Sequence, residues 1–205
     1  GIAPVPEKAK SQHYEVPAKF FELALGPHLK YSSALWLEGT QNLAEAELNM
    51  LKCYVERAEL ENGQDILELG CGWGSLSLYM AELFPESRIT AISNSASQKA
   101  FIDAKARERD LCNLVVITVD VNHFSTDARY DRVVSVEMLE HVRNYAAIFE
   151  RISHWLRPNG AMFAHIFCHD HLLYPFEVEG EEDWMAQYFF TGGMMPSYDT
   201  FTEFQ

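Results

Sequence analysis

The sequence predicts an α/β protein with a mainly parallel, doubly wound sheet. Five short runs of β-branched and apolar residues alternate with helical patterns between residues 65 and 167. Strands separated by helices normally form a parallel sheet with helices on both faces. The first run ends in three glycines spaced by single residues, directly before a helical pattern. With 205 residues and 48% apolar content, the chain can bury a sizeable core.

The chain divides into two parts of different character. Residues 1–62 carry helical patterns and no strand, and we expect a helical N-terminal cover that contributes to the active site. Residues 63–205 are expected to form the core. In the first part, Pro17–Leu25 is predicted to be a short helix with proline in its first turn. Asn42 should begin a second helix with a capping-box pattern, which ends at about Gly63.

The core elements follow in alternation. The predicted strands are Asp65–Leu69, Arg88–Ser93, Leu114–Val119, Tyr130–Val136 and Ala161–Phe167. Helices are predicted from Ser75 to Phe84, after a cap near Ser95, and after a cap at Asn144 that brings three large apolar residues onto one face. Residues 168–205 are less regular, with a turn predicted at Thr191–Pro196.

Charge and composition argue against several classes of partner. The formal net charge of −14 argues against a nucleic-acid backbone or an anionic membrane surface, and it is compatible with a cationic or amine substrate. There is no signal-peptide pattern and no apolar run of about 18 residues, so we expect no integral membrane segment. The four cysteines are widely spaced. We therefore expect reduced cysteines, no metal and a cytoplasmic location.

The first strand leads into the glycine motif, Glu68–Gly74, with glycines at every second position. Glycine permits a positive φ and lets a ligand approach the backbone, and the following helix directs unpaired N–H groups at the turn. An acid at Glu68 would repel a pyrophosphate but suits a ligand with ammonium and sulfonium charge. The pattern resembles motif I of S-adenosylmethionine-dependent methyltransferases.

Two other interpretations of the glycine motif remain open. A tight strand-to-helix turn needs no ligand, and G-x-G alone does not separate it from a binding loop. A dinucleotide-binding protein would need an acidic residue at the end of the second strand to hold a ribose. That strand ends in Ser93-Asn94, which argues against NAD.

The densest group of chemically active side chains follows the fourth strand. Ligands of open α/β sheets bind outside the carboxyl ends of the strands, and Glu137, Glu140 and His141 all lie there. One interpretation is a general base, with His141 oriented by Glu140 or Glu137. The other is a solvated helix start with N-terminal acids. A metal site is disfavoured, because this spacing is not a common ligand pattern.

Several stretches together resemble the cyclopropane-fatty-acid synthase superfamily of methyltransferases. They are His13–Glu15 with Lys30–Ser32, the glycine motif, Val136–His141, and in the tail His165–His169, Glu182–Trp184 and Tyr188–Ser197. The tail is most similar to the coclaurine N-methyltransferase-like branch, which methylates benzylisoquinoline alkaloid nitrogens. It is also the most discriminating stretch, because many methyltransferase families share the glycine motif.

The resemblance implies a Rossmann-like methyltransferase with S-adenosyl-L-methionine as cofactor and S-adenosyl-L-homocysteine as product. The implied cofactor residues are Glu68 with Tyr31 and Ser32 at the methionyl end, Gly70 and Gly72 beneath it, Asn94 and Gln98 at the ribose, and Asp120 and Val121 at the adenine. Glu140 and His141 would form the catalytic pair beside the substrate nitrogen, with Glu137 nearby. The acceptor is then a small molecule, with an amine favoured.

Two departures from the family pattern keep alternatives open. Lipid cyclopropane synthases have a cysteine that helps to hold a bicarbonate base, where this chain has Ser33, so a lipid-modifying enzyme is the second choice. Family members also continue past this length, and we expect the C-terminal strands of the sheet to be missing. Missing strands would leave one sheet edge open, so either the chain is a truncated product or a partner or second copy covers the edge. A truncated, non-catalytic S-adenosylmethionine-binding module is the third choice.

Overall fold

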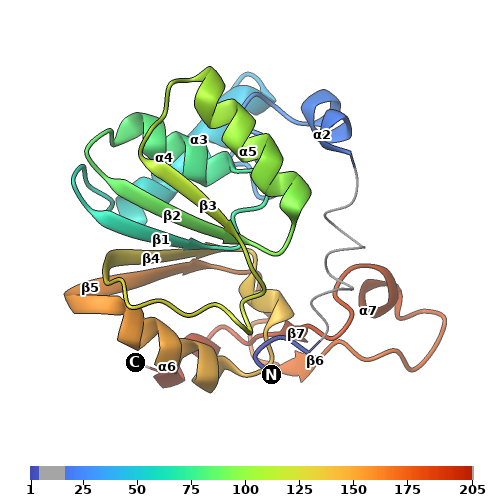
Figure 1. Cartoon of the computed structure of the whole chain (residues 1–205). Helices are drawn as coiled ribbons and strands as arrows, with labels where there is room; N and C mark the ends of the chain where they lie inside the picture. The colour runs from blue at the N-terminus through green and yellow to red at the C-terminus, as the bar shows by residue number, and fades with distance from the viewer. Residues whose placement is uncertain (5–16, 205) are drawn as a thin grey trace.

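A five-stranded parallel sheet forms the centre of the protein (Figure 1). The structure, a computed structural model, describes residues 1–4 and 17–204. The strands lie in the order β3-β2-β1-β4-β5. Their bounds are β1 Asp65–Leu69, β2 Arg88–Ser93, β3 Leu114–Thr118, β4 Tyr130–Val136 and β5 Leu156–His165. The doubly wound parallel sheet predicted from the sequence is confirmed.

Helices cover both faces of this sheet (Figure 1). On one face lie α3 (Leu43–Arg57), α4 (Ser75–Leu83) and α5 (Ala96–Glu108), and on the other lies α6 (Tyr145–Trp155). The shorter elements are α2 Ala18–Ala24, η2 Leu139–His141, β6 Tyr174–Pro175, α7 Trp184–Tyr188, β7 Met194–Met195 and η3 Thr200–Phe204. Among the described residues, none of the helices has the length and apolar character needed to cross a membrane.

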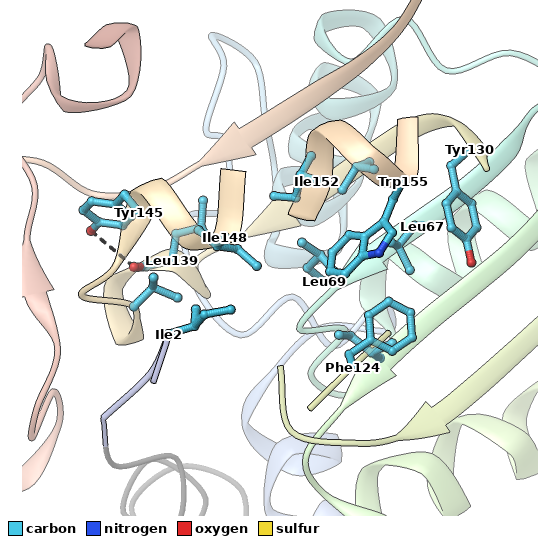
Figure 2. Close-up of a cluster of buried hydrophobic side chains, with 13 residues drawn as sticks. Ile2, Leu67, Leu69, Phe124, Tyr130, Leu139, Tyr145, Ile148, Ile152 and Trp155 are labelled. Atoms are coloured by element: carbon cyan, nitrogen blue, oxygen red, sulfur yellow. Dashed lines mark hydrogen bonds between the residues drawn. The ribbon is translucent and has the colours of Figure 1, made fainter. Parts of the chain in front are cut away.

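The largest core cluster lies between the sheet and α6 (Figure 2). Leu67 and Leu69 of β1 face Ile148 and Ile152 of α6, and all four side chains are buried. Further members come from other elements and include Ile2, Phe124, Leu139, Tyr145 and Trp155. The Tyr145 hydroxyl donates to the Leu139 carbonyl oxygen (3.3 Å), so the buried phenol is paired. Leu139, in the short segment after β4, belongs to this cluster. The cluster therefore holds the segment that carries Glu140 and His141 against α6.

Three helix starts form as their side chains predict. The Asn42 side chain accepts a hydrogen bond from Glu45 N, and Asn144 accepts one from Ala147 N (both 3.0 Å). Ser95 accepts one from Gln98 N (3.3 Å). Each cap satisfies a backbone donor that the first helical turn leaves unpaired.

The helix that starts after Asn42 ends at Arg57, earlier than the expected end at Gly63. Glu59 adopts a left-handed φ of +51°, and the Leu60 N–H returns to the Val55 carbonyl oxygen (3.0 Å). This reversal buries Leu60 in the core beside α4. Burial of that side chain therefore ends the helix before the glycine.

Two C-terminal expectations need correction. Strand β5 begins at Leu156, which pairs with Tyr130, and it contains an irregularity before the regular pairing resumes at Ala161. It ends at His165, two residues before the predicted end at Phe167, and the His165 carbonyl accepts the last hydrogen bond from the β4 side, that of the Glu137 N–H (2.8 Å). The expected turn at Thr191–Pro196 is only partly a turn, since Met194–Met195 pair with Tyr174–Pro175 as a short antiparallel ladder.

An ion-pair network holds the irregular part of β5 to the N-terminal edge of the sheet. Asp65 accepts hydrogen bonds from Arg88 (Nε 2.5 Å, Nη2 2.6 Å) and from Arg157. Arg157 also donates to Asp131 (2.5 Å), and Asp131 accepts the Asp65 N–H (2.8 Å). The hydrogen bond from Arg88 lowers the pKa of Asp65, with Arg157 adding to the effect against the cost of burial.

Asp65→Asn should destabilise the fold by about 2 kcal/mol at neutral pH, because it leaves charge-assisted hydrogen bonds unmade. A carboxylate whose pKa is lowered on folding stabilises above its unfolded pKa, here 3.8, and the contribution is lost as pH falls through the folded pKa. Urea unfolding of both proteins at pH 7 and at lower pH checks this. An equal difference at pH 7 and near pH 2 would contradict it.

Candidate active site

A pocket opens at the carboxyl ends of the central strands, where the sequence places most candidate residues. It is lined by Ala3, Gly70, Gly72, Ile92, Ser93, Asn94, Gln98, Val119, Asp120, Val121, Met138 and His141. The structure therefore brings six of the predicted cofactor residues together with the predicted base, His141. Parallel strands end at one edge of a sheet, which explains why residues so far apart in sequence meet here.

The glycines of the motif have different reasons to lack a side chain. All three have positive φ: +81° at Gly70, +52° at Gly72 and +83° at Gly74. A Cβ on Gly70 would lie 2.5 Å from Met138 Cγ, and one on Gly74 would lie 2.7 Å from Ile102 Cγ1. A Cβ on Gly72 would meet no protein atom within 4 Å. Gly72 thus faces open space in the pocket, where a ligand can contact the backbone.

The β2 and β3 side of the pocket offers polar groups with capacity left for a ligand. Gln98 is 1% exposed and accepts a hydrogen bond from Ser93 Oγ (2.6 Å), but its Nε2 is buried with no partner among the described residues. Asp120 Oδ1 accepts from Asn122 N and Nδ2 (2.8 and 3.0 Å). An unpaired buried amide is costly, so a ligand with an acceptor beside Gln98 would relieve that cost.

Glu68 lies behind the glycine turn and does not line the pocket. It is 3% exposed, and the Ser77 hydroxyl of α4 donates to its Oε2. Burial raises the pKa of Glu68 to about 7, and the Ser77 hydrogen bond and the Lys30 ammonium limit the rise. Its charge can therefore act on the pocket only through the turn.

The segment after β4 separates its two acids. Glu137, with a φ of +50°, accepts the Ser33 hydroxyl at its Oε1 (2.6 Å). Glu140 is fully buried, accepts Phe167 N at its Oε1 (3.3 Å), and its Oε2 has no hydrogen-bond partner in the described part of the chain. Burial raises the pKa of Glu140 to about 8. At neutral pH Glu140 can hold a proton, whereas Glu137 meets the N-terminal loop.

The ligand-free protein should lose stability as pH rises, because burial favours the protonated, neutral forms of Glu68 and Glu140 in the folded state. Folding raises their pKa values from 4.5 to about 7 and about 8. A raised pKa stabilises below the unfolded value, and the contribution is lost as pH rises through the folded value. The thermal midpoint should fall from about pH 5 to pH 8, less steeply for Glu68→Gln. An unchanged slope in that variant would contradict the assignment.

His141 lies between the pocket and the aromatic rings of the tail. Its ring centroid is 5.6 Å from that of Phe190, which contacts Phe167 (4.9 Å) and stacks on Phe176 (5.3 Å, 24°). Gly193 packs on the Glu140 carbonyl so closely that a Cβ would collide with it. The tail therefore packs against the segment Leu139–His141, and its aromatic rings lie beside the His141 imidazole.

The loop that carries Tyr31 and Ser32 lies outside the pocket lining. Tyr31 is 49% exposed and meets Phe21 of α2 edge-on (5.5 Å), and Phe21 in turn packs on Trp73 of the glycine motif (5.3 Å). Lys30 Nζ donates to the Ser32 carbonyl oxygen (2.7 Å). Tyr31, predicted at the methionyl end, is thus linked to the glycine motif through the Phe21 ring. His13–Glu15, also part of the resemblance, lie outside the described residues.

Sequence reasoning assigned no role to three residues of this region. Met138 packs on Gly70, Lys30 is buried beneath the loop, and Glu47 of α3 binds the loop backbone. A charged residue at position 47, on the apolar stripe shared with Leu51 and Tyr54, is the signal that could have identified Glu47. Among residues 1–4 and 17–204, no group of three or more His, Cys, Asp or Glu side chains could hold a metal ion.

Comparison with known proteins identifies relatives over the whole chain. Residues 5–205 match the family described as mycolic acid cyclopropane synthetase. (S)-Coclaurine N-methyltransferase of Thalictrum flavum subsp. glaucum is 39% identical over 206 residues, which cover 100% of this chain and 57% of that protein. Cyclopropane-fatty-acyl-phospholipid synthase of Escherichia coli strain K12 is 31% identical over 189 residues, covering 91% and 46%.

A solved structure agrees closely with the fold. The crystal structure of a coclaurine N-methyltransferase bound to N-methylheliamine and SAH has a TM-score of 0.93 and 36% identity, covering 100% of this chain and 59% of that one. The chain spans about half the length of the curated relatives it matches.

Proposed function

Because the chain belongs to the mycolic acid cyclopropane synthetase family, we propose that it is an S-adenosyl-L-methionine-dependent methyltransferase acting on the nitrogen of a small amine. The observation that carries the proposal is the pocket, in which cofactor-type residues and His141 line one cavity. The relative bound to N-methylheliamine and SAH supports both the cofactor and the class of acceptor. Cytoplasmic location and a second copy or partner at the sheet edge stay predictions.

The residues present fit this cofactor. Gly72 leaves open space for it, and the unpartnered Nε2 of Gln98 offers a donor for a ribose oxygen, with Asn94 beside it. Asp120, with Val121, would hold the adenine. The methionyl end would lie over the glycine turn, with Tyr31 and Ser32 above it, and Glu68 behind it would favour its positive charge. When bound, the cofactor supplies an electrophilic methyl group.

The protein's own contribution to the reaction is positioning and proton removal. Holding an amine in line with the methyl group supplies a large part of the rate of such a displacement. A protonated amine has no lone pair to attack with, so the imidazole of His141 would accept its proton. Glu140 is anchored to Phe167 and would fix the His141 segment, and Glu137 would add negative charge beside the substrate nitrogen.

A lipid-modifying reaction of the cyclopropane synthase type is the second candidate, favoured by the Escherichia coli relative. Against it, Ser33 stands where those enzymes have cysteine, and its hydroxyl is engaged by Glu137. The net charge of −14 also disfavours binding at an anionic lipid surface. A non-catalytic module that binds S-adenosylmethionine is the third candidate.

Calorimetric titration with S-adenosyl-L-methionine and S-adenosyl-L-homocysteine, with NAD as control, tests the cofactor half of the proposal. We expect both sulfur compounds to bind and NAD to give no heat. If neither S-adenosyl-L-methionine nor S-adenosyl-L-homocysteine binds, every methyltransferase interpretation is ruled out. Binding without methylation of any amine in a panel would favour the non-catalytic module.

A further inference from the structure

The loop between α2 and α3 is wrapped around one carboxylate. Glu47 of α3 is fully buried. Its Oε1 accepts the N–H groups of Gly26 (2.9 Å) and Lys30 (3.1 Å), and its Oε2 accepts that of His28 (3.0 Å). A Cβ on Gly26 would collide with Glu47 Oε2, so the backbone approaches the carboxylate closely. Hydrogen bonds to an ionised acceptor are about twice as strong as neutral ones, and three of them converge here.

Lys30 connects the Glu47 carboxylate to the part of the loop that holds Tyr31 and Ser32. Its backbone is held by Glu47, and its side chain is buried with Nζ 5.1 Å from the ring centroid of Tyr54. The same Nζ donates to the Ser32 carbonyl oxygen (2.7 Å). One residue later, Ser33 has a φ of +56° and donates its hydroxyl to Glu137 (2.6 Å). The loop is therefore fixed at one end by Glu47 and at the other by the segment that follows β4.

We propose that Glu47 is a positioning residue for methyl transfer, which places Tyr31 and Ser32 on the methionyl end of the cofactor. The inference rests on the function proposed above. The nucleoside end of the pocket is built separately, from Asn94 and Asp120 just beyond β2 and β3 and from Gln98 in the first turn of α5. Loss of the Glu47 hydrogen bonds therefore acts on one end of the cofactor and leaves the other in place.

Two ligands that share only the nucleoside end separate this role from a general structural one. S-adenosyl-L-homocysteine spans both ends of the site, whereas adenosine lacks the methionyl end. Glu47→Gln turns one acceptor oxygen into a donor that faces backbone N–H groups. It should raise the Kd of S-adenosyl-L-homocysteine about tenfold or more. The Kd of adenosine should change less than about twofold, because its contacts come from other elements.

Asp65→Asn is the matched control. It also replaces a buried carboxylate that accepts several hydrogen bonds, here from Arg88 and Arg157, but at the opposite end of the strands. It should lower the thermal midpoint and leave the ratio of the two Kd values unchanged. If Glu47→Gln does not fold, Glu47→Asp keeps the charge, shifts the carboxylate by one methylene, and should show the same selectivity with a smaller amplitude.

Selective loss of S-adenosyl-L-homocysteine binding, with a raised KM for S-adenosyl-L-methionine, is the expected result. Equal weakening of both ligands, or no weakening of either, would overturn the positioning role while the proposed function stands. If the unmodified protein fails to bind S-adenosyl-L-homocysteine, the proposed function fails first, and the two failures are thereby distinguished.

Discussion

Replacement of His141 by alanine should lower kcat for amine methylation by about 10²–10⁴-fold, the usual contribution of a general base. The imidazole lines the pocket and stands against the Phe190 ring, which is where the proposed function needs a group that accepts the proton of the amine. Without it, only the fraction of amine that reaches the site already deprotonated can react. The rate of the variant should therefore rise steeply with pH, and steady-state kinetics from about pH 6 to 10 measures this.

His154→Ala is a suitable control for the loss of a histidine. His154 lies on α6, and its Nδ1 contacts the Glu150 carbonyl oxygen of the same helix (2.7 Å), away from the pocket. Its removal should leave kcat unchanged. A His141→Ala enzyme that keeps full kcat at pH 7 would show that the proton leaves by another route, and Glu137 would then be the next residue to test.

Gly72→Val should weaken the binding of S-adenosyl-L-homocysteine by about 100-fold or more, equivalent to at least about 2.7 kcal/mol. The side chain would enter the part of the pocket where a Cβ at this position meets no protein atom. The loss therefore comes from the ligand's space rather than from a clash within the protein. Calorimetric titration measures the change in Kd.

The backbone strain of a valine at positive φ needs its own control, and Gly63→Val provides it. Gly63 also has a positive φ, +92°, and a Cβ added there would meet nothing within 4 Å, but it lies in the turn before β1 and not in the pocket. Both variants should lose stability, since left-handed conformations cost roughly 1–2 kcal/mol for residues with a side chain. Only Gly72→Val should lose ligand binding. Equal affinities for the two variants would contradict the placement of the ligand over Gly72.

The sequence predicted the sheet and the family well because both depend on local patterns. Strands β1, β2 and β4 have the predicted bounds, since each is a short run rich in apolar and β-branched residues with mostly buried side chains at its centre. The family expected from the glycine motif, Val136–His141 and the tail is confirmed. The residues at the strand ends converge because parallel topology forces them to one edge.

Contacts between distant segments could not be predicted in the same way. The Ser33–Glu137 hydrogen bond joins residues 104 positions apart, and no local pattern in either segment indicates it. Glu47 would be assigned to solvent from its charge alone, yet it is buried because three backbone N–H groups from another segment satisfy it. The irregular start of β5 likewise depends on Arg157 reaching Asp65 across the sheet.

Methyl transfer to an amine nitrogen can be followed with a labelled methyl group. The protein is incubated with S-adenosyl-L-methionine carrying an isotopically labelled methyl group, a panel of cyclic and aromatic secondary amines, and unsaturated phospholipid vesicles in parallel. Mass spectrometry then locates the label. We predict label on the nitrogen of at least one amine, with none in the acyl chains. Label in cyclopropanated or methylated acyl chains, with no amine product, would contradict the claim.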